Sequence, residues 1–314
     1  MTTESRVKIF SGRATRGLAE KIADAYGAEL GKSDVITFAD GEFQTSFEDN
    51  VRGDDVFIIQ STRQPSENLF ELLMMVDAAK RASARKIIAV IPYFGFARQD
   101  RKDRPRVPIT AKLIANMLTV AGVSRIVTVD LHADQIQGFF ETPVDHLYSS
   151  SFFVPYLKKK KIQNMMFASP DTGGTKRAAQ YAKVFDTGFA ICYKQRSRPN
   201  VVERMDLIGE VEGQNVILLD DILDTGNTMI KAAELIMKNG AESVTAMVTH
   251  PVLSGDAMER VEKSAISKLI VSDTIPLKRE SKKIEVLSTA ELFAEVIVRI
   301  ENCESISDLY NFKK

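Results

Sequence analysis

The stretch of this sequence with the most specific chemistry is residues 216–228, VILLDDILDTGNT. It predicts a buried strand that ends in Asp220 and Asp221, then a short polar loop, then a helix that starts near Thr228. Ligands of open α/β sheets bind at the carboxyl ends of the strands. Loop amides and a helix N-terminus offer hydrogen-bond donors and positive potential to a phosphate. The paired carboxylates suit the hydroxyls of a sugar, so the stretch predicts a sugar-phosphate site.

The loop itself consists of Asp224, Thr225, Gly226, Asn227 and Thr228. An alternative interpretation is a plain strand–turn–helix connection in which the aspartates serve as caps. The chain contains no GxxxxGK[ST] and no GxGxxG. The loop is therefore not a Walker A loop, and a Rossmann dinucleotide site has no support.

A second charged stretch, Arg98–Arg106 (RQDRKDRPR), holds five basic and two acidic residues after the predicted strand 86–91. Its proline and dense charge disfavour a helix or a buried strand. Such a loop offers several donors to the oxygens of a polyphosphate. The alternative is an ordinary solvated loop.

Residues 38–42 (FADGE) place an aromatic ring beside two carboxylates. A purine can stack on Phe38 while Asp40 or Glu42 accepts a hydrogen bond from its exocyclic amine. The alternative is that Phe38 belongs to the core, which is the more frequent place for a phenylalanine.

Two further strand ends carry metal or phosphate chemistry. Asp130 and His132 follow the predicted strand 125–129, where they suit a divalent metal or a bound phosphate, although His132 could equally be a hydrogen-bonded structural residue. Asp171, in SPDTGG at 169–174, could hold Mg²⁺ on an incoming polyphosphate.

Lys194 and Arg196 stand one residue apart after the apolar run 189–192, so on an extended segment they point the same way. They could straddle a phosphoryl group that gains charge in a transition state. The alternative is an exposed basic strand end.

Short apolar runs alternate with amphipathic segments along the chain, which favours parallel strands covered by helices on both faces. Strands are predicted at 86–91, 125–129, 216–219, 243–248 and 268–271, and helices at 110–121, 228–238 and 290–301. Thr110 is the expected N-cap of the first of these helices, and Gly122 its end. The pattern indicates two related α/β domains, residues 1–148 and 149–289, with the helix in 290–314 packing back on the first.

The composition of the chain excludes several classes of protein. The 314 residues hold 42 Lys+Arg and 42 Asp+Glu, and a net charge of zero argues against a general nucleic-acid binder. We expect no membrane span, because no apolar run reaches the roughly 20 residues that a bilayer requires. Two cysteines, Cys192 and Cys303, are too few for a disulfide scaffold, and the N-terminus has no apolar signal region. A cytoplasmic protein is expected.

Residues 216–228 resemble the phosphoribosyl pyrophosphate (PRPP) motif of type I phosphoribosyltransferases. The chain as a whole, from near residue 6 to near residue 311, resembles the class I ribose-phosphate pyrophosphokinases. The stretches that carry this resemblance are FADGE at 38–42, IPYFGFARQDRKDRPRVPITAKL at 91–113, VDLHADQIQGFF at 129–140, SPDTGG at 169–174, KQRSRPN at 194–200, VILLDDILDTGNT at 216–228 and THPVLSG at 249–255.

The resemblance implies two tandem phosphoribosyltransferase-like domains, the first for ATP and the second for ribose 5-phosphate. The implied reaction transfers the pyrophosphoryl group of MgATP to the 1-hydroxyl of ribose 5-phosphate, which gives PRPP and AMP for nucleotide biosynthesis. Homologues are typically hexameric, with phosphate as activator and ADP as inhibitor. The alternative is a catalytically silent homologue that regulates the enzyme.

The resemblance also implies residue roles. The ATP site would comprise Phe38, Asp40, Gly41, Glu42, Arg98, Gln99, Asp100, Arg101 and His132, with His132, Asp171 and Asp130 serving Mg²⁺. The ribose 5-phosphate site would comprise Arg196, Asp220, Asp221, Asp224, Thr225, Gly226, Asn227 and Thr228. Lys194 and Arg196 would be catalytic, and Arg52, Gln137, Ser305 and Ser307 would bind the regulatory phosphate or ADP. Gln195 and Asn227 depart from residues that are common in the family at these positions.

Overall fold

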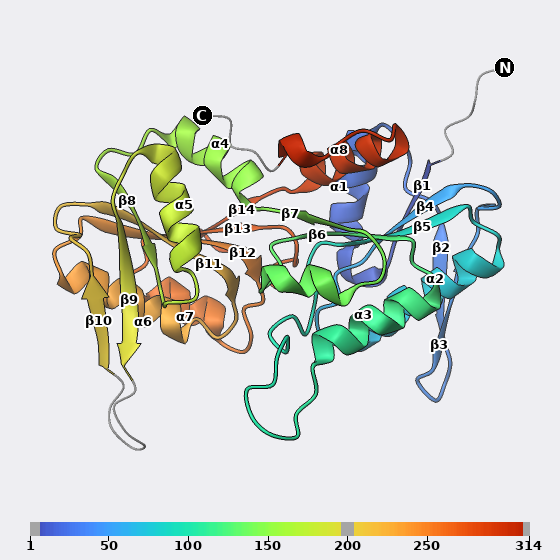
Figure 1. Ribbon diagram of the computed structural model, residues 1–314, viewed down its shortest axis with the longest axis horizontal. Helices are drawn as coiled ribbons and strands as arrows, with labels where there is room; N and C mark the ends of the chain where they lie inside the picture. Colours follow the sequence, from blue (N-terminus) through green and yellow to red (C-terminus); the bar gives the residue numbers. More distant parts are fainter. Residues whose placement is uncertain (1–6, 196–203, 310–314) are drawn as a thin grey trace. The chain divides into compact units, whose positions relative to one another are not determined.

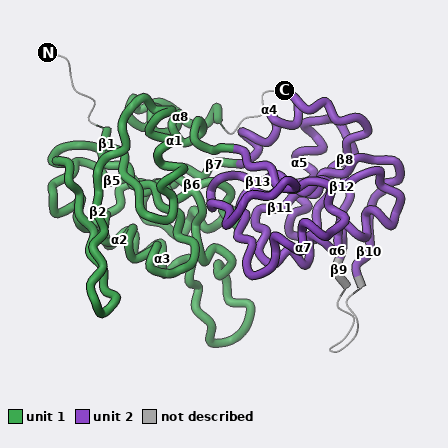
Figure 2. The backbone as a smooth tube through the Cα atoms, turned by 180° about the vertical axis from the view of Figure 1, so that it is seen from behind, with its two compact units in different colours: residues 1–148, 288–310 green, residues 149–287, 311–314 purple. Residues whose placement is uncertain are grey.

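The structure is a computed structural model, which describes residues 7–195 and 204–309 (Figure 1). The described chain forms two compact units, one of residues 7–148 with 288–309 and one of residues 149–287 (Figure 2). The first unit is therefore built from two separate pieces of the chain.

Unit 1 contains a five-stranded parallel sheet in the order β1-β4-β5-β6-β7, and a separate antiparallel hairpin, β2–β3. The strands are β1 (Val7–Ser11), β2 (Ser33–Thr37), β3 (Phe43–Phe47), β4 (Asp55–Ile59), β5 (Lys86–Ile91), β6 (Arg125–Val129) and β7 (Val144–Leu147). The helices are α1 (Arg16–Tyr26), α2 (Glu67–Arg81), α3 (Thr110–Ala121) and α8 (Ala290–Glu301), with short 3-10 turns η1 (Arg13–Thr15), η2 (Asp134–Phe139) and η3 (Ser307–Leu309).

The sheet of unit 1 is covered on both faces, with α1 and α8 on one side and α2 and α3 on the other (Figure 1). Strand β4 (DVFII) is buried at every position, and its four apolar residues after Asp55 suit a strand between two helical layers. Helix α8 returns to unit 1 from the far end of the chain, and the Tyr26 hydroxyl donates to Glu301 Oε2 at 2.6 Å.

Unit 2 contains a seven-stranded sheet in the order β10-β9-β8-β11-β12-β13-β14, in which only the β9–β10 pair is antiparallel. The strands are β8 (Met165–Ser169), β9 (Phe189–Gln195), β10 (Arg204–Ile208), β11 (Asn215–Leu223), β12 (Ser243–Pro251), β13 (Lys268–Ser272) and β14 (Ile284–Leu287). The helices are α4 (Ser150–Lys160), α5 (Thr175–Phe185), α6 (Asn227–Lys238) and α7 (Ala257–Lys263).

Successive residues of β11 face opposite layers of unit 2. Val216 and Leu218 pack in the cluster that includes α6 and α7, whereas Ile217 and Leu219 pack in the cluster that includes α4 and α5. Because side chains alternate along a strand, a continuous apolar run fills two cores at once. This alternation confirms the predicted α/β class, with parallel sheets flanked by helices.

The bounds of several elements differ from the sequence predictions. Strand β11 continues past the aspartates to Leu223 rather than ending at Leu219, because its neighbour β12 is equally long and pairs with it as far as Pro251. Thr110 is the first residue of α3 and not its N-cap, and its hydroxyl donates to Gln99 Oε1 at 2.6 Å instead. Helix α6 begins at Asn227, one residue before the predicted start.

Candidate active site

The strand order of unit 2 reverses at β8 and β11. From β8 the chain proceeds outward to β9 and β10, and it then crosses to β11 on the other side of β8. In open α/β sheets such a switch point leaves a crevice at the carboxyl ends of the two strands, where ligands bind. Asp171 follows β8, and residues 224–228 follow β11, so both predicted sites lie at the carboxyl ends of these two neighbouring strands.

Asp220 and Asp221 occupy adjacent positions in β11, and Asp221 is buried while Asp220 is half-buried. The pKa of Asp220 lies well above its usual value because of burial first and the neighbouring Asp221 charge second, with Asp171 acting in the same direction. Arg177 of α5 opposes this shift, and its Nη1 lies 3.5 Å from Asp221 Oδ1. The site therefore holds concentrated negative charge beside a cation, which suits the hydroxyls of a sugar better than its phosphate.

Residues 224–226 form the turn between β11 and α6, and Asn227 and Thr228 are the first two residues of the helix. Gly226 is the N-cap of α6 and has φ +77°, a left-handed conformation that glycine adopts without a steric penalty. The first N–H groups of a helix have no carbonyl partner within that helix, so they can bind an anion. The turn thus has the geometry that the sequence predicted for a phosphate loop.

Asp171 follows β8 and belongs to the same edge as Asp220. Its Oδ1 accepts hydrogen bonds from the N–H groups of Gly173 (2.8 Å) and Gly174 (3.2 Å). A Cβ at Gly174 would lie 3.7 Å from the carbonyl oxygen of Leu219, so the loop packs closely on β11. Asp171 is therefore fixed by its own loop within reach of the aspartate pair.

In unit 1 the basic segment 98–106 forms neither helix nor strand, as predicted, and residues 101–106 are exposed. It follows β5, whose neighbour β6 leads into the segment with Asp130 and His132. Asp100 Oδ2 accepts a hydrogen bond from Gln135 Nε2 at 3.3 Å, which ties the two segments together. Gln99 Oε1 accepts the hydrogen bond from the Thr110 hydroxyl, which orients the side-chain amide.

Asp130 is buried with φ +42°, and the next residues turn sharply away from β6. His132 is exposed at this strand end. The Leu131 N–H donates to Nε2 of the buried His146 at 2.9 Å, so His146 supports the backbone between Asp130 and His132.

The FADGE residues form the turn of the β2–β3 hairpin. Phe38 is 48% exposed, which excludes the core interpretation within this chain. The turn is defined by bonds from Phe38 N–H to Glu42 O at 2.7 Å and from Gly41 N–H to Phe38 O at 3.0 Å. Asp40 and Glu42 are both exposed beside the ring. The arrangement leaves the ring and its flanking carboxylates open to a planar ligand.

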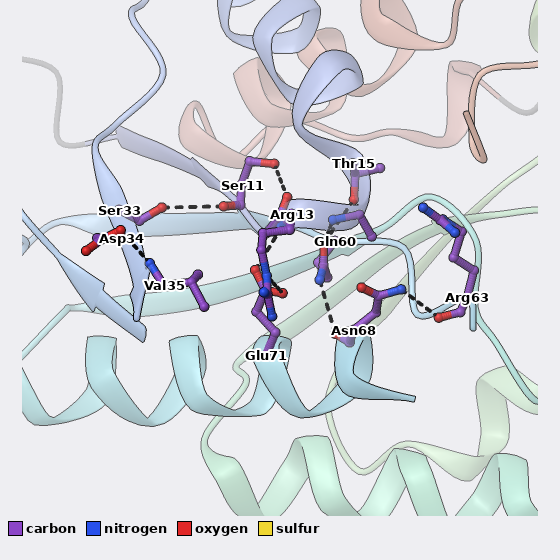
Figure 3. A network of polar contacts seen from close by, with 12 residues as sticks. Ser11, Arg13, Thr15, Ser33, Asp34, Val35, Gln60, Arg63, Asn68 and Glu71 are labelled. Atoms are coloured by element: carbon purple, nitrogen blue, oxygen red, sulfur yellow. Dashed lines mark hydrogen bonds and ion pairs between the residues drawn. The ribbon is translucent and has the colours of Figure 1, made fainter. Parts of the chain in front are cut away.

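A buried polar network, which sequence reasoning missed, supports the carboxyl ends of β1 and β4 (Figure 3). Gln60 Oε1 accepts hydrogen bonds from Ala14 N–H and from the Thr15 hydroxyl, and its Nε2 donates to Asn68 O. Glu71 is fully buried and accepts two bonds from Arg13, from the backbone N–H at 2.8 Å and from Nε at 2.9 Å. A glutamine directly after an apolar strand and a glutamate on a helix face are weak sequence signals, which explains why both were missed.

Sequence reasoning also missed Arg177, whose only signal was its place in a basic helix after Asp171. Lys194 lies in β9, but the structure does not describe its side chain, and Arg196 lies outside the described residues. Of the predicted regulatory residues, Arg52 Nη1 donates to Ser83 Oγ at 3.2 Å, Gln137 donates to Asp134 O, and the hydroxyls of Ser305 and Ser307 are 2.7 Å apart.

Among the described residues no group of three or more His, Cys, Asp or Glu side chains could hold a metal by itself. The described helices are also too short or too polar to cross a membrane.

Comparison with known proteins identifies the family. Residues 7–122 match the N-terminal domain of ribose phosphate pyrophosphokinase, and residues 195–311 match the phosphoribosyl synthetase-associated domain. The ribose-phosphate pyrophosphokinase of Porphyromonas gingivalis is 52% identical over 99% of this chain and 100% of that protein. That of Bacillus caldolyticus is 49% identical over 98% of this chain and 99% of that protein.

A crystal structure of phosphoribosylpyrophosphate synthetase from Mycobacterium smegmatis matches 96% of this chain and 100% of that chain, with a TM-score of 0.90 and 37% identity. The fold and the site thus define a protein with two phosphoribosyltransferase-like domains. The chain belongs to the ribose-phosphate pyrophosphokinase family, as the sequence motifs predicted.

Proposed function

We propose that this protein transfers the pyrophosphoryl group of MgATP to the 1-hydroxyl of ribose 5-phosphate, which yields PRPP and AMP. The observation that carries the proposal is the aspartate pair followed by the phosphate loop at the switch point of unit 2. Unit 2 binds ribose 5-phosphate there. Unit 1 contributes to the ATP site through residues 98–101, His132 and the turn of the β2–β3 hairpin.

The sugar is bound at both ends in this mechanism. The amides of residues 225–228 hold the 5-phosphate at the positive end of α6, while Asp220 and Asp221 accept hydrogen bonds from the ribose hydroxyls. Two fixed ends orient the anomeric hydroxyl toward the β-phosphorus, and such orientation supplies much of the rate of phosphoryl transfer.

The nucleotide is bound by stacking and by charge. Phe38 stacks on adenine, Asp40 or Glu42 accepts from its amine, and Arg98, Gln99 and Arg101 donate to the phosphates. Asp130 and His132 in unit 1, and Asp171 in unit 2, are the residues that would serve as ligands for Mg²⁺ on the ATP phosphates. The ion would supply neutralisation of the phosphate oxygens. Lys194 and Arg196 stabilise the transferring group as its charge grows.

The assay is direct. Purified protein is incubated with ATP, Mg²⁺, ribose 5-phosphate and inorganic phosphate, and AMP and PRPP are measured. We expect both products in equal amounts. Formation of neither product contradicts the proposal and favours the silent regulatory homologue. Repeating the assay across phosphate and ADP concentrations tests the expected activation and inhibition, and the mass of the particle in solution tests the expected hexamer.

A further inference from the structure

Arg260, on the short helix α7, contacts the phosphate loop of unit 2 at two points. Its Nη1 donates to the carbonyl oxygen of Thr225 at 3.2 Å, and its Nη2 donates to Oδ1 of Asn227. One guanidinium therefore spans the loop on either side of Gly226. Arg260 lies 32 residues beyond the PRPP motif in sequence, and no motif in the sequence marks it.

The neighbouring backbone supports the loop in the same way. The N–H groups of Leu253 and Ser254 donate to the carbonyl oxygens of Leu223 (2.9 Å) and Asp224 (3.1 Å). A Cβ at Gly226 would lie 3.7 Å from the Val261 side chain of α7. The carbonyls of three consecutive residues, 223 to 225, thus accept bonds from the segment that runs from Leu253 to Arg260.

This support matters because the loop would otherwise be free to move. Thr225 and Asn227 are exposed, and Gly226, with φ +77°, places little restriction on the backbone. A loop that binds phosphate through its amides binds more tightly when those amides are already fixed, since less conformational freedom is lost on binding. Arginine suits the task because its planar fork holds two acceptors in one geometry, which a lysine ammonium does not.

We propose that Arg260 is a positioning residue for ribose 5-phosphate, which holds the phosphate loop in its binding conformation by bridging Thr225 and the Asn227 side chain. The inference rests on the proposed function of that loop. Asn227 takes the place of a smaller residue common in the family, and it gives the guanidinium a side-chain acceptor that glycine or alanine lacks.

The first test compares the effect of one substitution on the KM values of the two substrates. Arg260→Ala should raise the KM for ribose 5-phosphate about tenfold, as expected when charged hydrogen bonds are lost, and should leave the KM for ATP and the Tm nearly unchanged. Calorimetric titration of the ATP-free protein with ribose 5-phosphate should show the same loss of affinity. Arg260→Lys should restore only part of it, because one ammonium cannot hold both acceptors in the fixed geometry of the guanidinium.

Arg279→Ala is the matched control. Arg279 donates two hydrogen bonds of 2.8 Å to Glu262, which lies on α7 two residues after Arg260, and it lowers the pKa of that carboxylate to about 2. These bonds do not involve residues 224–228. The control removes an arginine contact from α7 and should leave the affinity for ribose 5-phosphate unchanged. A loss equal to that of Arg260→Ala would show that α7 stability, and not the bridge, is responsible.

A double-mutant cycle tests whether Arg260 acts through its hydrogen bond to Asn227. Asn227→Ala should weaken ribose 5-phosphate binding less than Arg260→Ala does, and the double variant should weaken it by less than the product of the two effects, because both substitutions break the same bond. Independent effects, or an Arg260→Ala protein with the wild-type KM, would overturn the inference. If the unaltered protein itself does not bind ribose 5-phosphate, the proposed function fails instead.

Discussion

At the scale of single residues, Asp220 belongs to the proposed sugar site and carries a charge that burial disfavours. Burial and Asp221 raise its pKa in the folded protein above the value in the unfolded chain. The folded protein therefore holds this proton more tightly than the unfolded chain does. This preference stabilises the fold in full at pH values below the unfolded pKa, and the stabilisation is lost as the pH rises through the folded pKa. Ionisation of Asp220 therefore lowers the free energy of unfolding as the pH rises, a cost in stability that binding and catalytic sites commonly carry.

Asp220→Asn should accordingly stabilise the protein while it weakens ribose 5-phosphate binding. We expect the Tm at pH 8 to rise by about 2–4 °C, which corresponds to about 1 kcal/mol in a domain of this size, and the gain to shrink toward pH 4. Thermal unfolding across this pH range measures it. Asp221→Asn, which also removes the pair with Arg177, is the comparison and should gain less. A gain that is equal at all pH values would exclude ionisation as the cause.

Phe38 allows a separate test of the nucleotide site. Because its ring is half exposed, Phe38→Ala removes little core packing and should leave the Tm unchanged. Stacking of a base on an aromatic side chain contributes roughly 1–3 kcal/mol, so we expect the KM for ATP to rise about tenfold or more. The KM for ribose 5-phosphate serves as the internal control. An unchanged KM for ATP would remove Phe38 from the adenine site.

At the scale of elements, the β2–β3 hairpin is anchored to the rest of unit 1 by the two ends of β3. The rings of Phe47 in β3 and Phe10 in β1 pack edge to face, with their centres 4.4 Å apart. The Arg13 guanidinium lies 5.1 Å from the centre of the Phe43 ring. The same Arg13 bonds the fully buried Glu71 of α2. One arginine thus joins the hairpin, the start of η1 and α2, while the turn with Phe38 remains exposed.

The two partners of this ion pair should respond unequally to substitution. Arg13→Ala leaves a buried carboxylate without its side-chain cation and should destabilise the protein by about 2–4 kcal/mol. Glu71→Gln leaves a half-exposed arginine that water can solvate, and its amide oxygen can still accept from the Arg13 N–H, so it should cost about 1 kcal/mol. Urea unfolding of both variants gives the comparison. A larger cost for Glu71→Gln would contradict this account.

The elements themselves were predicted best where the pattern is local. The strands 86–91 and 125–129 and the helix 290–301 have the predicted bounds, because apolar runs and helical periodicity record burial directly. The end of β11 could not be read in this way, since its last residues are held in the sheet by β12. Arg177, Arg260 and the Gln60 network escaped prediction because each acts on residues distant in sequence.

At the scale of the whole molecule, the chain builds two units that each have their own sheet and core. The core of unit 1 includes a segment from the C-terminal end, where α8 buries Phe293, Val296 and Ile297. Unit 2 is continuous in sequence and has apolar clusters on both faces of its sheet. The apolar face of this helix led us to predict that it packs back on the first domain, and residues 288–309 belong to unit 1. The sequence could not show which sheet the helix covers, because that sheet lies far away along the chain.

Matched core substitutions should therefore act on one unit at a time. Phe293 of α8 and Phe167 of β8 are both fully buried, and replacing either with alanine should cost about 3–5 kcal/mol. In hydrogen exchange, Phe293→Ala should reduce protection mainly in residues 7–148 and 288–309, and Phe167→Ala mainly in 149–287. Under conditions where both variants remain folded, Phe293→Ala should retain ribose 5-phosphate binding in calorimetry more fully than Phe167→Ala, because the phosphate loop belongs to unit 2. Equal loss of protection across the chain in both variants would mean that the units unfold as a single cooperative structure.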